Sequence, residues 1–450
     1  MEIYCSCIYD ILQLMKLYYG KETKKALNNF PFSVRRTRNE FILAMTQIKK
    51  AAALANYKAD NLSKDIRNAI IKVCDEILEN KHANQFPLAY LQGGAGTAIN
   101  MNVNEVIANI ATLILKNKVK VHPNDHVNQC QSTNDVNPSA LKISAFYLLQ
   151  DLNDKLTSLV KTFEVKAKEF KKINKLGRTH LQDAIPTTLG AEFEAYAHNL
   201  KRYVAQIKIS ANLCRILNLG GTAIGNSMNA TPLYIKEVYR ELNKITNGKF
   251  YKAKNMIAKT SGQTDFLLIS QTVTALCLDL SKIANDLRFM ASGPRGGIGE
   301  IILPELQKGS SIIPGKVNPI MPETVNQLYY LVSGNNVSIE KATEASQMEL
   351  GVMLPIIVEK LIDSIKITTE IISQFDKLCI AGIKANKERC KYHLENSTAY
   401  STLLVPRLGY DIVSEIVKKS ISTNKTLRDI VVGEKYLEEK EFNKIISLQR

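Results

Sequence analysis

The sequence predicts an all-α protein, in which a bundle of long helices carries smaller helical domains at its N- and C-terminal ends. Three observations favour this fold class. Apolar residues recur at spacings of three and four over runs far longer than a typical globular helix. Few stretches have the alternation of β-branched residues that marks a strand. No internal repeat of fixed period is present, so the helices are not expected to form a solenoid.

The first half of the chain contains the longest predicted helix. Shorter helices are expected over about 40–56 and 64–79, which are rich in alanine, leucine and lysine. Asn137-Pro138 has the composition of an N-cap and first helical position, so the long helix is expected to begin there and to end near Ile173. One apolar stripe would face the core, made of Leu141, Ala145, Leu148, Leu152, Leu156, Leu159 and Phe163.

The second half continues the helical pattern. Helices are expected over about 188–217, from Thr231-Pro232, and over 319–350 and 352–379. A near-heptad seam runs through Val273, Leu276, Leu280, Ile283, Leu287 and Met290. Predicted helices become shorter after about Asn386. We therefore divide the chain into an N-terminal helical domain (1–134), a central long-helix bundle (135–385) and a small C-terminal domain (386–450).

Composition excludes several functional classes. The net charge is +16, but the lysines are scattered and no nucleic-acid-binding motif is present, so nucleic acid is not the expected partner. Eight cysteines form no C-x-x-C pair and six histidines have no ligand spacing, so we expect free thiols and no metal. Residues 1–16 lack a basic start and a long apolar run, which predicts a cytoplasmic protein without a membrane anchor.

The segment 309–319, Gly-Ser-Ser-Ile-Ile-Pro-Gly-Lys-Val-Asn-Pro, is the most informative stretch. Its glycines favour a mobile loop, and Asn318-Pro319 marks the start of a helix. Ser310 and Ser311 offer hydroxyls, while Lys316 offers a positive charge for an anion. Few structural needs require this combination, so the segment predicts a binding or catalytic loop.

Three other polar clusters lie in separate predicted loops. They are Thr97 after a glycine-rich turn, then Ser132, Thr133 and Asn134, and finally Thr179 and His180. Two of these clusters also have a structural interpretation. Ser132 to Asn134 could simply cap the following helix, and Thr179-His180 could be a loop pair that bonds to backbone groups.

Taken together and in this order, the four clusters closely resemble the motifs of the fumarase/aspartase superfamily, and most resemble its aspartate ammonia-lyase branch. The resemblance covers about 400 residues, from Leu17 on. It implies the long-helix bundle of the fumarase/aspartase type and a homotetramer whose active sites are shared between subunits. It also implies a small dicarboxylate substrate and no cofactor.

The resemblance assigns roles to these residues. It implies that Ser310 removes the Cβ proton of L-aspartate, that an aci-carboxylate forms, and that fumarate and ammonium are released. The β-carboxylate would be held by Thr97, Ser132, Thr133 and Ser311, and the α-carboxylate by Thr179, Lys316 and Asn318. Asn134 and His180 would contact the amino group. We expect Ser310, His180 and Lys316 to be the catalytic residues.

Two alternatives stay open at this point, a class II fumarase and a non-catalytic structural relative. The run Asn-Pro-Ile-Met-Pro-Glu at 318–323 favours the aspartase branch over fumarase. Four positions depart from the usual family residues, namely Asn226, Ser227, Gly351 and Val405. All four lie in segments near the expected site, so they could alter its activity or its substrate.

Overall fold

The computed structural model describes residues 17–446, so Cys5, Cys7 and the predictions made for residues 1–16 lie outside the described residues. Helices dominate this part of the chain, which confirms the all-α fold class. The helices are α2 (Lys21–Asn29), α3 (Asn39–Lys58), α4 (Lys64–Leu78), α5 (Thr97–Ile114), α6 (Thr133–Glu169), α7 (Leu189–Cys214), α8 (Pro232–Thr246), α9 (Met256–Ser261), α10 (Thr264–Met290), α11 (Ile320–Glu344), α12 (Leu354–Leu378), α13 (Lys387–Glu395), α14 (Ser401–Leu408), α15 (Tyr410–Thr423), α16 (Leu427–Gly433) and α17 (Glu439–Ile446).

The strands of the described residues are short and form three two-stranded sheets. The pairs are β1 (Asn174–Thr179) with β2 (Gln182–Thr188), β3 (Ile216–Leu217) with β4 (Tyr251–Lys252), and β5 (Ile301–Ile302) with β6 (Lys384–Ala385). The β3–β4 pair is parallel and the other two are antiparallel. None of these strands was predicted, because they are too short or too polar to show an alternating pattern.

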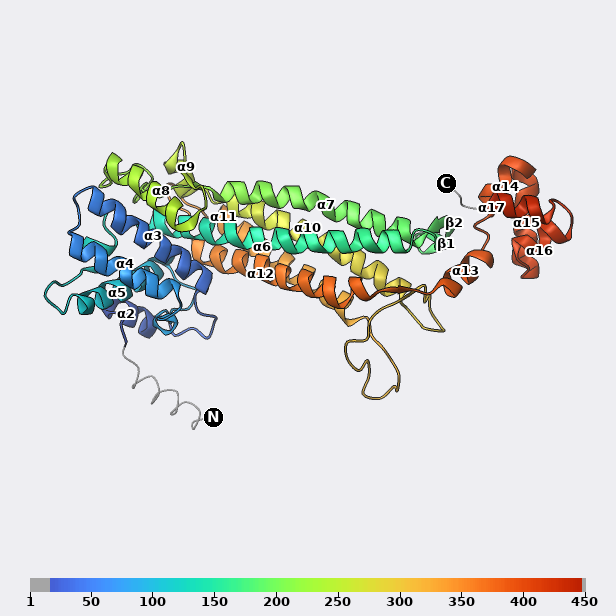
Figure 1. The fold of residues 1–450 in the computed structure, drawn as a ribbon, viewed down its shortest axis with the longest axis horizontal. Coiled ribbons are helices and arrows are strands. Elements are labelled where there is room, and N and C mark those ends of the chain that lie inside the picture. The colour runs from blue at the N-terminus through green and yellow to red at the C-terminus, as the bar shows by residue number, and fades with distance from the viewer. Residues whose placement is uncertain (1–16, 447–450) are drawn as a thin grey trace. The chain divides into compact units, whose positions relative to one another are not determined.

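The chain packs into two compact units, each made of discontinuous segments. Unit 1 contains the chain up to Leu152, Gln206–Thr274 and Leu331–Ile367, and unit 2 contains Asn153–Ala205, Ala275–Tyr330 and the chain from Thr368 on. In each unit, stretches of α6, α7, α10, α11 and α12 run side by side (Figure 1). The division at 134/135 and 385/386 was drawn from the lengths of the predicted helices, and not from packing in space, so it stays a prediction.

In unit 1, α3 packs against α4 and α8 (Figure 1). Local signals explain where these helices begin. Ser63 caps α4 by accepting a hydrogen bond from the N–H of Ile66, and Thr231 caps α8 in the same way through Tyr234. Pro232 then occupies the first position of α8, as the sequence predicted.

The start of α6 differs from the prediction. The helix begins at Thr133, and Pro138 lies inside it. A proline has no N–H to donate to the carbonyl of residue i−4, so the carbonyl of Asn134 is left without a helical donor. The side-chain amide of Asn218 donates to this oxygen at 3.0 Å. The helix can therefore contain the proline because a distant side chain supplies the missing hydrogen bond.

The predicted apolar faces are buried with one exception. Six of the seven residues of the α6 stripe are buried, but Leu148 is only half-buried and its neighbour Leu149 lies in the core instead. All six residues of the α10 seam are buried. By length and composition alone α10 could also cross a membrane, but half of its most apolar window is buried in the structure. The seam therefore identifies α10 as a helix of the bundle core.

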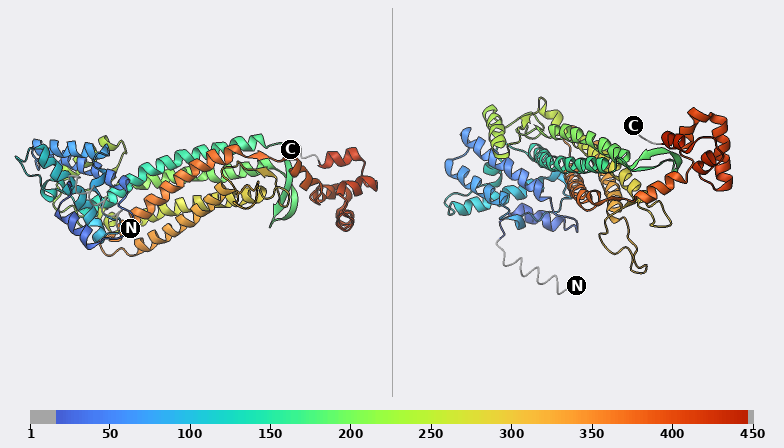
Figure 2. Two further views of the ribbon diagram at one scale, coloured as in Figure 1. Left: turned by 90° about the horizontal axis from the view of Figure 1, so that it is seen from below. Right: turned by 45° about the vertical axis from the view of Figure 1, so that its right-hand side comes forward.

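In unit 2, the short helices α14–α17 gather together at the C-terminal end of the chain (Figure 2). Their core includes Leu404, Ile416, Val431 and Phe442, and Leu176 of β1 belongs to the same cluster. The six cysteines among the described residues are all free, and only Cys130 is not fully buried. The expectation of buried free thiols is confirmed for this part of the chain.

Candidate active site

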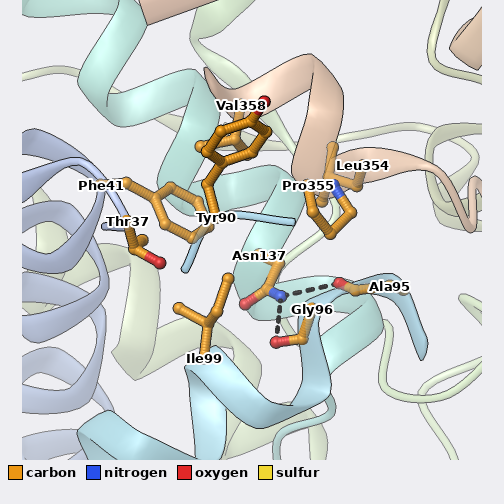
Figure 3. Close-up of a pocket in the computed structure, with 10 residues that line it drawn as sticks. All are labelled: Thr37, Phe41, Tyr90, Ala95, Gly96, Ile99, Asn137, Leu354, Pro355 and Val358. Carbon is orange, nitrogen blue, oxygen red and sulfur yellow. Dashed lines mark hydrogen bonds between the residues drawn. The ribbon is translucent and has the colours of Figure 1, made fainter. Parts of the chain in front are cut away.

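Thr97 is the first residue of α5 and follows a tight turn that needs left-handed backbone angles. Gly94 and Gly96 have φ values of 59° and 81°, and Ala95 has a φ of 54°. The side-chain amide of Asn137 donates to the carbonyls of Ala95 at 3.0 Å and Gly96 at 3.3 Å, and this binds the turn to α6 (Figure 3). The Thr97 hydroxyl is exposed and donates to the carbonyl of Gly94 at 2.7 Å.

Ser132, Thr133 and Asn134 form the beginning of α6. The hydroxyl oxygen of Ser132 accepts a hydrogen bond from the N–H of Asn134 at 3.2 Å, as an N-cap does. The hydroxyl oxygen of Thr133 accepts from the side-chain amide of Asn100 at 3.3 Å. Asn134 donates its own side-chain amide to the carbonyl of Ala223 at 2.8 Å, so its Oδ1 is left to accept from a ligand.

Asp135 holds two loops together beneath this cluster. Its carboxylate is fully buried and accepts from the N–H of Ser132 at 2.9 Å and from those of Gly220 and Thr222 at 3.0 Å each. Burial raises the pKa of Asp135 to about 6, although the three N–H donors favour its charged form. Sequence reasoning did not single out this residue. The Ser-x-x-Asp spacing of a capping box was the available signal.

Thr179 and His180 lie at the tip of the β1–β2 hairpin. Thr179 pairs with Gln182, so His180 and Leu181 form a two-residue turn, and their φ values are 53° and 62°. Two successive left-handed residues define a turn that normally uses asparagine and glycine. Each costs about 1–2 kcal/mol for an ordinary side chain. The side chain of Leu181 at this strained tip is 64% exposed.

A buried cluster of charges anchors the first strand of this hairpin. Glu300 is fully buried and pairs with Arg178 at 2.9 Å and with Lys175 at 3.0 Å. Lys175 also pairs with Glu192 at 2.7 Å. Burial raises the pKa of Glu192, and Lys175 opposes this shift. Because Glu300 directly precedes β5, the cluster connects the hairpin to the strand that leads into the loop at 303–319.

The loop at 303–319 closes on itself at Gly309. The N–H of Gly309 donates to the carbonyl of Lys316 at 3.1 Å, and the side-chain amide of Asn318 donates to the carbonyl of Gly309 at 2.6 Å. A Cβ at position 309 would lie 2.0 Å from the Lys316 oxygen, so only glycine fits there. The predicted N-cap Asn318 therefore closes the loop with its side chain.

Within this loop, the Ser310 oxygen accepts two backbone hydrogen bonds. The N–H groups of Ile312 and Ile313 point at Ser310 Oγ from 3.1 and 3.0 Å. Ser311 and Lys316 are exposed, and the Ile312 side chain is 85% exposed. Lys316 makes no ion pair with any residue of the described chain. The loop thus presents a serine with two donors on its oxygen and a cation without a protein partner.

The predicted site residues fall into two groups, one in each compact unit. Unit 1 brings together Thr97, Ser132, Thr133 and Asn134 through the side chains of α5 and α6. Unit 2 holds Thr179 and His180 on the hairpin, and Ser310, Ser311, Lys316 and Asn318 on the loop. Each group contains neutral donors, and the cation belongs to unit 2. Neutral donors bind carboxylate oxygens directionally, and a lysine supplies a point charge for an anion.

Comparison with known families identifies the chain. The sequence profile of the family described as "Lyase" matches residues 14–334, and that of the "Fumarase C C-terminus" matches residues 401–450. Aspartate ammonia-lyase of Bacillus subtilis (strain 168) is 43% identical over 435 residues, which cover 96% of this chain and 92% of the relative. The chain belongs to the fumarase/aspartase superfamily. It is a carbon–nitrogen lyase.

Other members of the superfamily are similarly related. Aspartate ammonia-lyase of Escherichia coli (strain K12) is 42% identical over 442 residues, covering 96% of this chain and 92% of that one. A fumarate lyase:delta crystallin from Brucella melitensis bound to cobalt has a TM-score of 0.92 at 39% identity. A class II fumarase from Schistosoma mansoni has the same TM-score at 31% identity. Both structures cover 96% of this chain, which in turn covers 95% of each.

The departures from the usual superfamily residues have local explanations. A Cβ at Gly351 would lie 2.2 Å from Nε2 of Gln263, so the buried Gln263 side chain fills the space that an asparagine at 351 would need. Asn226 accepts from the N–H of Met228 at 3.2 Å, and Ser227 has a φ of 61°, so both belong to a tight turn. Val405 packs against the core of the C-terminal helices. None of these departures removes a polar group from the predicted set.

Proposed function

We propose that this lyase converts L-aspartate to fumarate and ammonium, with Ser310 as the base. The aspartate ammonia-lyases that are 42–43% identical along almost the whole chain support the reaction. The observation that carries the mechanism is the pair of backbone N–H groups directed at Ser310 Oγ. A serine hydroxyl is a poor base, and donors aimed at its oxygen stabilise the alkoxide that can act as one.

The elimination then proceeds in two steps. The Ser310 alkoxide takes a proton from Cβ, and the electrons of the C–H bond move into the adjacent carboxylate to form an aci-carboxylate with two negative charges. The Cα–N bond breaks next, and its electron pair leaves with ammonia as the Cα–Cβ double bond forms. Transfer of the Ser310 proton to ammonia or to solvent restores the alkoxide and yields ammonium.

The β-carboxylate and its aci-form are held by the hydroxyls of Thr97, Ser132, Thr133 and Ser311. Thr133 is already oriented for this role. Its oxygen accepts from Asn100, and it donates to no other residue of the described chain, so its hydrogen is available to an anion. The Thr97 hydroxyl now donates to Gly94 and must rotate toward the substrate.

The other end of the substrate requires a cation and acceptors. Lys316 binds the α-carboxylate, assisted by Thr179 and by the second amide hydrogen of Asn318, whose first one serves Gly309. Asn134 and His180 contact the amino group. Asn134 suits this role because its side-chain NH2 group donates to the carbonyl of Ala223. Its amide oxygen can then accept from the substrate ammonium, which can only donate.

We further propose a homotetramer in which residues of different subunits complete each site. Long helices of this chain expose large apolar side chains, among them Leu278 and Phe289 of α10 and Tyr330 of α11. Several exposed apolar side chains on one long helix are typical of a surface that other subunits cover. Mixing and refolding two impaired variants, Thr133→Val and Ser310→Ala, should give more activity than the average of the two alone, because some sites receive both native residues. Mixtures with only the average activity of their components would contradict shared sites.

Fumarase activity is the second candidate, since the class II fumarase from Schistosoma mansoni has the same fold over 96% of this chain. One assay separates the possibilities. Purified protein is given L-aspartate and, separately, L-malate, while the ultraviolet absorbance of fumarate is followed. Turnover of L-aspartate supports the proposal, and turnover of malate alone would replace it with the fumarase reaction. Silence with both substrates would contradict both reactions.

A further inference from the structure

Lys49 of α3 is a fully buried lysine that the reaction described above does not use. Its side chain is 0% exposed. The Nζ atom donates to Oδ1 of Asn128 at 2.8 Å and to Oε1 of Gln131 at 3.0 Å. Both partners lie in the segment that leads directly into the Ser132–Asn134 cluster. The lysine therefore supports that cluster from the interior of unit 1.

The partners of Lys49 are unusual for a buried charge. In the described part of the chain, both of its hydrogen-bond partners are neutral amides, and no carboxylate lies within ion-pair distance of Nζ. A buried cation without an ion pair is costly, and an apolar side chain of similar length would serve packing better. This cost favours a role for Lys49 beyond packing.

Lys49 determines which end of the Asn128 amide faces it. A lysine ammonium donates and cannot accept, so the atom opposite Nζ must be the amide oxygen. Asn128 Oδ1 also accepts from the side-chain amides of Asn100 and Asn104, both at 3.2 Å. The reverse orientation of Asn128 would place its NH2 group against three donors. An uncharged lysine also has a lone pair that can accept, but its two hydrogens match the two amide oxygens that it faces.

The orientation passes from Asn128 to Thr133. Because Asn128 presents an oxygen, Asn100 must present its NH2 group to that oxygen. The same NH2 group reaches Thr133 Oγ1 at 3.3 Å, and Asn100 is itself buried. Thr133 must therefore accept at this contact, and its own hydrogen points elsewhere. Each hydrogen bond in such a chain polarises the next one.

We propose that Lys49 is a positioning residue, which sets the direction of the hydrogen bonds through Asn128 and Asn100 so that the Thr133 hydroxyl donates to the substrate carboxylate. The proposal rests on the role given to Thr133 in the proposed function. It assigns Lys49 no contact with substrate. A positioning role differs from a general structural role because the effect of Lys49 on substrate binding must depend on the Thr133 hydroxyl.

A double-mutant cycle tests this dependence. Lys49→Met, Thr133→Val and the double variant are compared by kcat/KM for L-aspartate and by the Kd of succinate, a dicarboxylate that cannot eliminate. A hydrogen bond to a charged group is worth enough to predict a loss of about 10- to 100-fold for each single variant. If Lys49 acts through Thr133, the kcat/KM and the succinate Kd of the double variant should be within about threefold of those of the more impaired single variant.

The control is Lys50→Met, at the next position of the same helix. Lys50 pairs with Asp75 of α4 at 2.5 Å and has no hydrogen bond to the 128–134 segment. This variant should leave kcat/KM and the succinate Kd unchanged. Losses that multiply in the double variant would indicate a general structural effect and would overturn the proposal. A Lys49→Met protein that matches the control would overturn it as well.

A second pair of variants decides the matter if Lys49→Met does not fold. Asn100→Asp puts an acceptor against both Asn128 Oδ1 and Thr133 Oγ1, so the Thr133 hydroxyl is drawn inward to donate to it. Asn128→Asp keeps an acceptor in front of Lys49 and Asn100. We expect Asn100→Asp to weaken succinate binding at least tenfold more than Asn128→Asp. Equal losses in the two variants would contradict the proposed direction of the hydrogen bonds.

The two readouts separate failure of this inference from failure of the proposed function. A wild-type protein that binds succinate but does not release fumarate from L-aspartate would refute the lyase reaction, while the cycle measured by Kd would still test Lys49. A wild-type protein that binds neither dicarboxylate would overturn both.

Discussion

Gly309→Ala tests whether the closed neck of the loop at 303–319, where Gly309 bonds to Lys316 and Asn318, is needed for turnover. The added Cβ would lie 2.0 Å from the Lys316 oxygen, and ordinary contact begins at 3.4 Å, so the neck must open by about 1.4 Å. This displacement breaks the 3.1 Å bond from Gly309 N–H to Lys316 and disturbs the one from Asn318. The two bonds together are worth about 1–2 kcal/mol.

That energy corresponds to a fall of about 5- to 30-fold in kcat/KM for L-aspartate. The loop is largely exposed and lies outside the core, so Tm should not change. Gly296→Ala is the matched control, because a Cβ at position 296 would meet no atom within 4 Å. A Gly309→Ala enzyme with the turnover of the control would refute the idea that this neck positions Ser310 and Lys316.

Two further predictions concern the buried charges of unit 1. Asp135→Asn replaces one of the oxygens that accept from Ser132, Gly220 and Thr222 with a donor, and should lower the free energy of unfolding by about 1–3 kcal/mol; an unchanged Tm would contradict this. Burial lowers the pKa of Lys49 to about 7, although Asp135 and Cys74 act in the opposite direction. Between about pH 7 and the ordinary pKa of 10.5, unfolding therefore takes up a proton. The stability of the wild type relative to Lys49→Met should rise with pH across this window, by at most about 1.4 kcal/mol per pH unit. A Tm difference between the two proteins that does not change from pH 7 to 10.5 would contradict the shift.

The helices could be predicted because their signal is local. The α10 seam repeats at the helical period, so it identified a buried face without knowledge of the neighbours. The start of α6 could not be found in the same way. Pro138 is a good first residue by local rules, and its place inside the helix depends on Asn218, which is 80 residues away in the sequence. The β1–β2 hairpin was missed because His180-Leu181 is an uncommon pair for its turn.

The candidate site divides along the same line. Ser310, Lys316 and Thr133 were predicted because their residue types and order resemble a known set of motifs. The capping-box spacing could have indicated the contact of Asp135 with Ser132. Its bonds to Gly220 and Thr222 and the contacts of Lys49 could not be predicted, since they join segments far apart in the sequence. The cause is physical: a buried polar group is defined by its partners, and the sequence does not state them.

The central claim is that Ser310, with two N–H donors on its oxygen, removes the Cβ proton of L-aspartate. The most direct measurement is the exchange of the Cβ hydrogen of L-aspartate with deuterium from solvent, compared with fumarate release, in the wild type and in Ser310→Ala. The account predicts that Ser310→Ala keeps the Tm and succinate affinity of the wild type but loses both exchange and release by at least about a thousandfold, the scale on which removal of a catalytic nucleophile or base acts. A folded Ser310→Ala protein that still exchanges this hydrogen at close to the wild-type rate would contradict it.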